Sequence, residues 1–335
     1  LCAALDTEPP VSVRLNPAKC GGTENGGAGR EEDADKAAGR SDGVPPAVLA
    51  DADGRVPWCG DGYYLAARPQ FTFDSDFHAG AYYVQEAASQ FVGHLLQGVE
   101  VAGRRILDLC AAPGGKTTLY ASLVGPDGLV VANEIDRRRA QVLADNVRKW
   151  GTGNVAVTTC EARQLGGFEA WFDVVAVDAP CSGEGMFRKD PDATREWSPA
   201  SVELCSGRQR RILASAVAAL APGGVLVYST CTYNRDENDL NAAWVVREFD
   251  LDPVHLDVPA DWNIAATEYG YQFFPHRVQG EGFFIAVFRK KEGPARKHNP
   301  ASGFKNLKPL AKNQVPELGR WLRPGAELRF FETTS

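Results

Sequence analysis

From Arg104 onward the chain alternates short apolar runs with longer amphipathic segments, and this alternation constrains the fold more than any other feature. Strands that alternate with helices predict an α/β architecture with a doubly wound, mostly parallel sheet. The predicted strands are RRILDLC (104–110), GLVVANEI (128–135), NVAVTTC (154–160), FDVVAVDAP (172–180), GVLVYSTCT (224–232) and GFFIAVFRK (282–290). The predicted helices cover about 85–96, a segment ending near 123, 136–151, 198–220 and 236–249. In such sheets ligands bind outside the carboxyl ends of the strands, so the residues at those ends are the candidates for function.

The first predicted strand runs into DLCAAPGGKTT, a glycine-rich turn that opens a helix. The turn shares its lysine and threonine with a Walker A phosphate loop, but Cys110 stands where that loop requires its first glycine. It also lacks the full GxGxxG fingerprint of dinucleotide-binding proteins. Its glycines still allow a ligand to approach the backbone closely, and the N–H groups at the start of the helix suit a carboxylate or a phosphate.

Acidic residues follow the next three predicted strands in order: Glu134, Glu161 and Asp178. A carboxylate at the end of the second strand can accept both hydroxyls of a ribose. A carboxylate after the third strand can meet an adenine amino group. Each acid alone would be an ordinary solvated residue, but three of them after a glycine-rich first turn indicate a nucleoside ligand with an amino-acid tail. S-adenosylmethionine (SAM) is such a ligand and is the predicted cofactor.

Two cysteines lie in polar turns after neighbouring predicted strands, Cys181 in DAPCSGEG and Cys231 in STCTY. A lone cysteine is by default a buried and inert thiol, but these polar turns do not suit an apolar core. A thiolate can attack a ring carbon and later leave again. Addition of a thiolate to carbon 6 of cytosine makes carbon 5 enamine-like, so that it can take a methyl group from SAM before a base removes its proton. Two cysteines beside a SAM site therefore indicate that each of them has a different task in this reaction.

The composition argues against several other classes of protein. Eight cysteines in 335 residues are few for a disulfide scaffold, and because none of them has CxxC spacing, no metal site is predicted. No transmembrane span and no signal peptide are visible. The net charge of −7 does not indicate a general nucleic-acid binder, although residues 20–55 alone carry −4, with eight acids against four bases. These properties favour a cytoplasmic protein with free thiols and no membrane partner.

Four motifs together resemble those of a known family. LDLCAAPGGKTT, NEID, VDAPCSGEGMFRKDP and YSTCTYNRDEN are similar to the motif series of the RNA cytosine-5 methyltransferases of the RsmF/NSUN type. FHAGAYYVQEAAS is similar to that family's approach to its catalytic domain. The resemblance covers about residues 56–290. It implies a Rossmann-like, SAM-dependent methyltransferase that is most like the bacterial RsmF-like ribosomal RNA enzymes.

The resemblance also implies a role for each candidate site residue. Cys231 is implied as the nucleophile, and Cys181 as the residue that helps to release the methylated product. Asp178 would help to hold the cytosine, and Lys116 would support the site electrostatically. The family usually has Asp where Glu161 stands, which leaves the adenine contact open. The implied SAM-binding residues are Cys110, Ala111, Ala112, Pro113, Gly114, Gly115, Lys116, Glu134, Glu161 and Asp178.

The same reasoning divides the chain into four parts. Residues 1–19 are predicted to be the end of an N-terminal RNA-binding segment, because VSVRLNPAK is similar to the last part of that segment in the family. Residues 20–55 are rich in Gly, Ala and charge and contain no aromatics, which predicts a disordered acidic insertion. Residues 56–290 are the predicted catalytic domain. Residues 291–335 are predicted to be a linker and the start of a C-terminal domain that is truncated here.

The leading hypothesis is a monomeric enzyme that methylates carbon 5 of a cytosine in RNA, most simply ribosomal RNA, through a covalent cysteine adduct. Transfer RNA is the alternative substrate for the same chemistry. A non-catalytic RNA-binding or ribosome-assembly factor that retains the fold is the alternative from another class, and the two intact cysteines argue against it. Arg188, Lys189 and Arg195 are candidates for phosphate contacts, although solvated surface charges would produce the same pattern.

Overall fold

The structure is a computed structural model that describes residues 1–20, 46–294, 307–311, 315–316 and 331–333. The chain divides into two compact units, Leu1–Ala295 and Arg296–Ser335. In the second unit the described residues include two short antiparallel strands, β14 (Leu307–Pro309) and β15 (Phe331–Thr333). The elements below all belong to the first unit.

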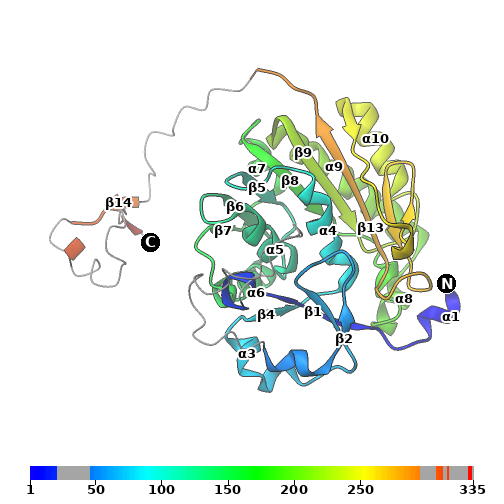
Figure 1. Ribbon diagram of the computed structural model, residues 1–335. Coiled ribbons are helices and arrows are strands. Elements are labelled where there is room, and N and C mark those ends of the chain that lie inside the picture. The colour runs from blue at the N-terminus through cyan, green and yellow to red at the C-terminus, as the bar shows by residue number, and fades with distance from the viewer. Residues whose placement is uncertain (21–45, 295–306, 312–314, 317–330, 334–335) are drawn as a thin grey trace. The chain divides into compact units, whose positions relative to one another are not determined.

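The first unit is built on a nine-stranded sheet. Eight of its strands have the order β11-β12-β13-β9-β8-β5-β6-β7, and the ninth, β10, pairs with β13. The strands that pair in parallel are β5 (Arg105–Asp108), β6 (Leu129–Asn133), β7 (Val155–Thr158), β8 (Phe172–Asp178) and β9 (Leu220–Thr230). The antiparallel strands are β10 (Leu251–Pro253), β11 (Ala265–Ala266), β12 (Gly270–Phe273) and β13 (Phe283–Lys290). Figure 1 shows β9 and β13 side by side, where the parallel part of the sheet meets the antiparallel part. The predicted doubly wound, mostly parallel architecture is confirmed.

Helices cover both faces of this sheet, because successive side chains of a strand point to opposite sides. Ile106 and Val174 pack on one face with α4 and α5, whereas Leu107 and Val175 pack on the other face with α7, α9 and α10. Helix α6 packs through Leu143 against the end of β6. The helices are α4 (Ala87–Gln97), α5 (Gly115–Val124), α6 (Arg137–Trp150), α7 (Ala162–Gly166), α9 (Pro199–Ala219) and α10 (Asp239–Phe249).

Local sequence signals set the ends of the helices near the site. The side chain of Asp136 accepts hydrogen bonds from the backbone N–H groups of Arg138 and Arg139, both at 2.9 Å, and so begins α6. Gly151 ends α6 with a φ of 83°, a left-handed conformation that glycine adopts without strain. Because Asp136 caps α6, which starts at Arg137, Glu134 stays outside the helix, directly after β6 at the carboxyl edge of the sheet.

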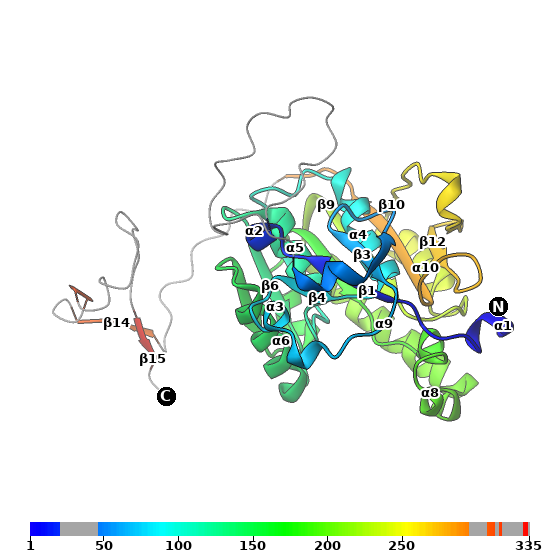
Figure 2. The same ribbon diagram turned by 60° about the horizontal axis from the view of Figure 1, so that its bottom comes forward.

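A second, four-stranded sheet, here called the small sheet, has the order β2-β3-β1-β4. Figure 2 shows β1, β3 and β4 together on the side of the unit where α4 lies, and Trp58, from the turn before β3, packs against Phe91 of α4. The strands are β1 (Val11–Leu15), β2 (Ala52–Arg55), β3 (Gly62–Leu65) and β4 (Tyr82–Val84). The residues before position 20 therefore share one sheet with residues beyond position 55.

The end of the predicted disordered insertion is different in the structure. Residues 47–55 form a 3-10 helix (Ala47–Asp51) and strand β2, which pairs with β3. Val48 is only 5% exposed and packs in a small core with Val13 and Tyr82. A composition averaged over the whole segment hides this short apolar stretch. Residues 21–45, the rest of the predicted insertion, lie outside the described residues.

The remaining elements of the first unit are short. They are α1 (Cys2–Leu5), α2 (Pro17–Cys20), α3 (Ser75–His78), α8 (Pro191–Glu196) and the 3-10 helices Phe71–Phe73, Glu184–Met186 and Ala260–Trp262. Among the described residues no helix combines the length and the apolar character needed to cross a membrane. In the same part of the chain no group of three or more His, Cys, Asp or Glu residues has an arrangement that could hold a metal ion.

Candidate active site

A cavity of about 1080 Å³, here called the strand-end cavity, opens along the carboxyl ends of the parallel strands. Helix α9 forms one of its walls. The structure therefore gathers around one cavity six residues that the sequence places at the ends of five strands. These six are Cys110, Glu134, Glu161, Asp178, Cys181 and Cys231.

A smaller cavity of about 220 Å³ lies along the glycine-rich turn and shares Cys110, Ala112 and Asp178 with the strand-end cavity. Its lining also includes four other predicted residues: Ala111, Pro113, Gly115 and Lys116. Gly114 lines neither of the two cavities. Gly114 has a φ of 112°, which favours glycine, and a Cβ atom added there would lie only 3.1 Å from Leu143 Cδ1. Gly114 therefore allows the backbone of the turn to adopt its shape.

The two predicted cysteines meet where β8 and β9 end. These strands pair in parallel with Asp178 opposite Ser229, so the turns that follow them leave the sheet side by side. The sulfur atoms of Cys181 and Cys231 lie 3.1 Å apart. The hydrogen bond between them lowers the pKa of the Cys231 thiol, whereas the same bond, together with burial, raises the pKa of Cys181. Cys231 is therefore the thiol of the pair that loses its proton first.

Iodoacetamide is expected to alkylate Cys231 before Cys181, and at a lower pH than it alkylates an ordinary thiol. The hydrogen bond from Cys181 stabilises the Cys231 thiolate, so Cys181→Ala should move the pH midpoint of Cys231 alkylation upward. Peptide mass spectrometry of protein alkylated over a pH series measures the midpoint of each thiol. Equal reactivity of the two thiols, or a Cys231 midpoint unchanged in Cys181→Ala, would contradict the assignment.

Lys116 and Asp178 form an ion pair beside the thiols. Lys116 Nζ lies 2.9 Å from Asp178 Oδ2, and the Ser229 hydroxyl donates to Asp178 Oδ1 at 2.7 Å. The ammonium group also lies 5.0 Å from the centre of the Phe283 ring. Because both carboxylate oxygens already accept a hydrogen bond, the Asp178 side chain is held in one orientation at the edge of the strand-end cavity.

A second carboxyl group, that of Asp108, lies beneath the glycine-rich turn. It is 1% exposed and accepts a hydrogen bond from the Thr117 hydroxyl at 2.7 Å. Burial raises the pKa of Asp108 to about 7, although the bond from Thr117 opposes this shift. The ion pair of Lys116 and Asp178 therefore has a neighbour that exchanges a proton near neutral pH.

The two other predicted acids occupy contrasting environments. Glu134 is 3% exposed, accepts a hydrogen bond from the backbone N–H of Asp136 at 3.0 Å and forms an ion pair with Arg139 at 3.2 Å. Each of its oxygens retains a lone pair for a further donor. Glu161 is exposed and precedes α7, where its backbone N–H donates to Gln164 Oε1 at 2.9 Å. Both carboxylates line the strand-end cavity, so both are available to a ligand there.

Glu237 supports the thiol pair, and the sequence analysis did not identify it. Its side chain is fully buried and accepts hydrogen bonds from the Ser182 backbone N–H at 3.0 Å, from Gln209 Nε2 at 2.6 Å and from Asn234 Nδ2 at 2.8 Å. Gln209 also donates to the Pro180 carbonyl at 3.0 Å. The Glu237 carboxylate thus joins the residues on either side of Cys181 to the turn that follows Cys231. Its only sequence signal is an acid in the polar run NRDEN.

Glu184 makes a second connection between the same two turns. Its carboxylate accepts hydrogen bonds from the backbone N–H of Tyr233 at 2.9 Å, from Asn234 Nδ2 at 3.2 Å and from Trp197 Nε1 at 3.0 Å. The backbone N–H of Gly185 donates to the Cys231 carbonyl at 2.7 Å. Several independent hydrogen bonds therefore set the separation of the two sulfur atoms, rather than the strand pairing alone.

Arg14 of β1 is a third site-supporting residue that the sequence analysis did not identify. It is 1% exposed and donates to Gln85 Oε1 and to Thr118 Oγ1, both at 2.7 Å, and to the Gly115 carbonyl at 3.2 Å. Its guanidinium group lies 4.6 Å from the centre of the Trp150 ring. Burial lowers its pKa to about 10, so the group stays charged at neutral pH. Arg14 ties the small sheet to the first turn of α5, next to the glycine-rich turn.

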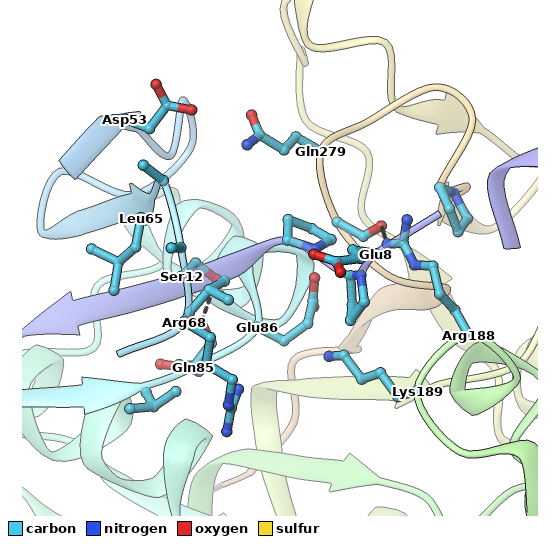
Figure 3. Close-up of a pocket in the computed structure, with 18 of the residues that line it drawn as sticks. Glu8, Ser12, Asp53, Leu65, Arg68, Gln85, Glu86, Arg188, Lys189 and Gln279 are labelled. Carbon is cyan, nitrogen blue, oxygen red and sulfur yellow. Dashed lines mark hydrogen bonds between the residues drawn. The ribbon is translucent and has the colours of Figure 1, made fainter. Parts of the chain in front are cut away.

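A separate cavity of about 700 Å³ lies between the small sheet and the loop that carries Arg188 and Lys189 (Figure 3). The Arg188 side chain is 4% exposed and lies 3.0 Å from Glu281, and Lys189 lies 3.6 Å from the same carboxylate. Arg195 pairs with Asp192 on the surface of α8 at 2.7 Å. Arg188, a predicted phosphate contact, is instead one partner of a buried ion pair, because the fold brings Glu281 from 93 residues away.

Comparison with protein-family models gives two matches. Residues 97–289 match the model described as 16S rRNA methyltransferase RsmB/F. Residues 44–87 match the model described as the N-terminal domain of 16S rRNA methyltransferase RsmF. The second match crosses position 55, where the sequence analysis placed a domain boundary, and so does the pairing of β2 with β3.

Curated and solved relatives extend these matches. Ribosomal RNA small subunit methyltransferase F from Escherichia coli (strain SMS-3-5 / SECEC) is 39% identical over 247 residues, covering 71% of this chain and 51% of that protein. The chain spans about half the length of the curated relatives it matches. A methyltransferase homolog protein from Pyrococcus horikoshii superposes with a TM-score of 0.68 at 26% identity, covering 87% of this chain and 89% of that chain. NSun6 from the same organism, crystallised with SFG, superposes with a TM-score of 0.58 at 28% identity, covering 68% and 57%.

Proposed function

The chain belongs to the RsmB/F family of 16S rRNA methyltransferases, and on this premise we propose that it transfers a methyl group from SAM to carbon 5 of a cytosine in RNA. The observation that carries the proposal is the pair of thiols, with Cys181 and Cys231 at 3.1 Å on the wall of a cavity that also holds Asp178. A non-catalytic RNA-binding or assembly factor has no use for two thiols held in this way. The thiol pair therefore favours the enzyme.

The donor and acceptor groups around the two cavities suit SAM. The first N–H groups of α5 are available for the methionine carboxylate, Glu134 for the ribose hydroxyls and Glu161 for the adenine amino group. The residues proposed to bind it are those that the motifs imply, from Cys110 to Lys116 together with the acids at the strand ends. When bound, SAM supplies an electrophilic methyl group. The family usually has Asp at the position of Glu161. The side chain of Glu161 is longer but carries the same carboxylate group.

The proposed chemistry assigns a task to each side chain of the site. The Cys231 thiolate forms a bond to carbon 6 of the cytosine, and the displaced electron pair makes carbon 5 the nucleophile for the methyl group. A base then removes the proton from carbon 5, the ring regains its double bond and Cys231 leaves as a thiolate. Cys181, in contact with the departing sulfur, assists this release. Asp178 and Lys116 hold the ring and balance the charge that develops on it.

The proposed substrate is small-subunit ribosomal RNA, because the curated relatives carry that name. Transfer RNA is the second candidate, for which the chemistry of the thiol site would be the same. We also propose that the protein acts as a monomer in the cytoplasm, where its eight free cysteines would remain reduced. Of the predicted division of the chain, we retain the N-terminal RNA-binding segment (1–19), the catalytic domain (56–290) and the linker with the start of a C-terminal domain (291–335), whereas residues 47–55 of the predicted insertion are ordered.

The direct test is to incubate the chain with methyl-labelled SAM and, in separate reactions, with 16S ribosomal RNA, assembled small subunits and transfer RNA. Each RNA is then digested to nucleosides, which are identified by chromatography and mass spectrometry. The expected product is 5-methylcytidine in the ribosomal substrate. A methyl group on any other atom, or no transfer by protein that binds SAM, would refute the proposed reaction. Label in transfer RNA alone would refute the ribosomal assignment.

Cys181→Ala is expected to accumulate a covalent adduct between the protein and RNA. Without Cys181 the first bond still forms at Cys231, but the methylated product is released slowly. Denaturing electrophoresis of reactions with labelled RNA should show a slowly migrating band that disappears on digestion with ribonuclease. Ser182→Ala, at the next position, is the matched control and should show no such band. An adduct that appears with Cys231→Ala instead would mean that the two cysteines have the opposite roles.

A further inference from the structure

Helix α9, labelled beside β9 in Figure 1, carries two exposed arginines on the wall of the strand-end cavity. Arg208 and Arg211 line the cavity together with Ser215, and their spacing places them on one face of the helix. Leu204, one turn before Arg208, extends the same face and is 70% exposed. This face of α9 is here called the arginine face.

The arginine face begins next to the thiols. Gln209, which follows Arg208, points inward and donates to the Pro180 carbonyl at 3.0 Å, so this turn of α9 contacts the loop that carries Cys181. Gly183 and Met186 of that loop also line the strand-end cavity, and Met186 is 39% exposed. A ligand that reaches Cys231 through the cavity would therefore pass the arginine face.

Arg208 and Arg211 lack an acidic partner on their own helix, whereas two other exposed helical arginines, Arg148 and Arg195, have one. Arg148 lies 2.6 Å from Asp145, three residues earlier, and Arg195 lies 2.7 Å from Asp192 in the same relation. No acid stands three or four residues from either Arg208 or Arg211, where the sequence has Leu204, Cys205, Gly207, Ile212, Ala214 and Ser215. Within the described part of the chain neither guanidinium group takes part in an ion pair or a side-chain hydrogen bond.

The absence of helical partners has an energetic consequence. Two like charges three residues apart on a helix repel each other, and no acid three or four residues away on α9 offsets that repulsion. An anion bound between them would offset it. Guanidinium groups also match the geometry of phosphate oxygens, to which they can donate two hydrogen bonds at once.

We propose that Arg208 and Arg211 bind phosphates of the RNA strand on the flank of the target cytosine. The inference rests on the proposed function and adds the surface along which the RNA backbone runs. A cytosine must leave its stack to reach Cys231, and its neighbours then expose their base faces. Leu204 on the arginine face and Met186 on the cavity wall are exposed apolar side chains that can cover those faces. Because the chain carries a net charge of −7, such local cations must hold the RNA, rather than a general attraction.

The test compares RNA binding by the wild-type chain, Arg208→Ala, Arg211→Ala and the double variant over a series of salt concentrations. Each lost phosphate contact should make the slope of log K against log salt less steep by about 0.7 to 1. The KM for RNA should rise while kcat at saturating RNA and the affinity for SAM stay close to wild type. Arg148→Ala is the matched control, an exposed arginine on a helix with its own acidic partner, and it should keep the wild-type slope.

Two results would overturn the inference while leaving the proposed function intact. Wild-type salt slopes in the double variant, with methylation of RNA unimpaired, would show that the arginines do not contact phosphate. A loss of SAM affinity equal to the loss of RNA affinity would place them in the cofactor site instead. A wild-type chain that binds SAM but methylates no RNA would refute the proposed function itself.

Discussion

Cys231→Ala is expected to abolish methyl transfer, with kcat reduced by at least about 10³-fold and the affinity for SAM unchanged. Without the thiolate, carbon 5 of cytosine stays a poor nucleophile, and Cys181, the other thiol of the site, has a raised pKa and does not supply the bond to carbon 6. Cys231 lies beyond the end of β9, and the glycine-rich turn follows β5, so the substitution leaves the cofactor-binding residues in place. Transfer of label from SAM to RNA measures the first effect, and calorimetric titration with SAM measures the second.

Cys205→Ala is the matched control for this loss of activity. Cys205 is a partly buried cysteine of α9 and does not line the strand-end cavity, so its removal should leave kcat within a few-fold of wild type. Turnover that persists in Cys231→Ala would remove Cys231 from the role of nucleophile. If Cys205→Ala lost turnover while Cys231→Ala kept wild-type turnover, the nucleophile would be Cys205 of α9.

Glu237→Ala is expected to lower the free energy of unfolding by about 3 kcal/mol and to slow methyl transfer by about 10²-fold or more. The substitution leaves the Ser182 N–H without its acceptor, removes one partner each from Gln209 and Asn234 and opens a gap in a fully buried region. The turn after β8 then loses its fixed relation to the turn after β9. A displacement of the thiols by about 1 Å is enough to cost two orders of magnitude in rate.

Chemical denaturation and single-turnover assays separate the two effects of this substitution. Glu237→Gln keeps the volume and one acceptor oxygen, so it should fall between wild type and Glu237→Ala in both measurements. Glu248→Ala, an exposed acid on neighbouring α10, should change stability by no more than about 0.5 kcal/mol. If Glu237→Ala unfolds at the wild-type denaturant concentration and turns over normally, the carboxylate has no positioning role.

The sequence was a good guide to the parallel sheet and to the residues at the strand ends. Alternating apolar runs place Glu134, Asp178 and Cys231 at the same edge, because parallel strands joined by helices must all end there. The glycine-rich turn could be recognised for a similar reason, since a tight strand-to-helix connection demands glycine at fixed positions. These constraints are local or topological, and each can be recognised from a short stretch of consecutive residues.

Contacts between residues far apart in the chain could not be predicted from the sequence. Arg188 resembled a surface cation until the fold paired it with Glu281, and Glu237 resembled one more acid in a polar run. Arg14 lies 101 residues from Gly115, to which it donates a hydrogen bond. The segment 47–55 was predicted to be disordered because its composition is polar, yet pairing of β2 with β3 orders it.

By itself, then, the sequence determined the order of strands and helices, the edge of the sheet at which the candidate site residues gather and the place of the two cysteines after neighbouring strands, because these depend on periodicity and on short motifs. Only the tertiary structure decided that the thiols lie 3.1 Å apart, which of the two has the lowered pKa and which buried carboxylates hold their turns together. Those properties depend on distances and on burial between residues far apart in the chain. Such distances are set when the core packs.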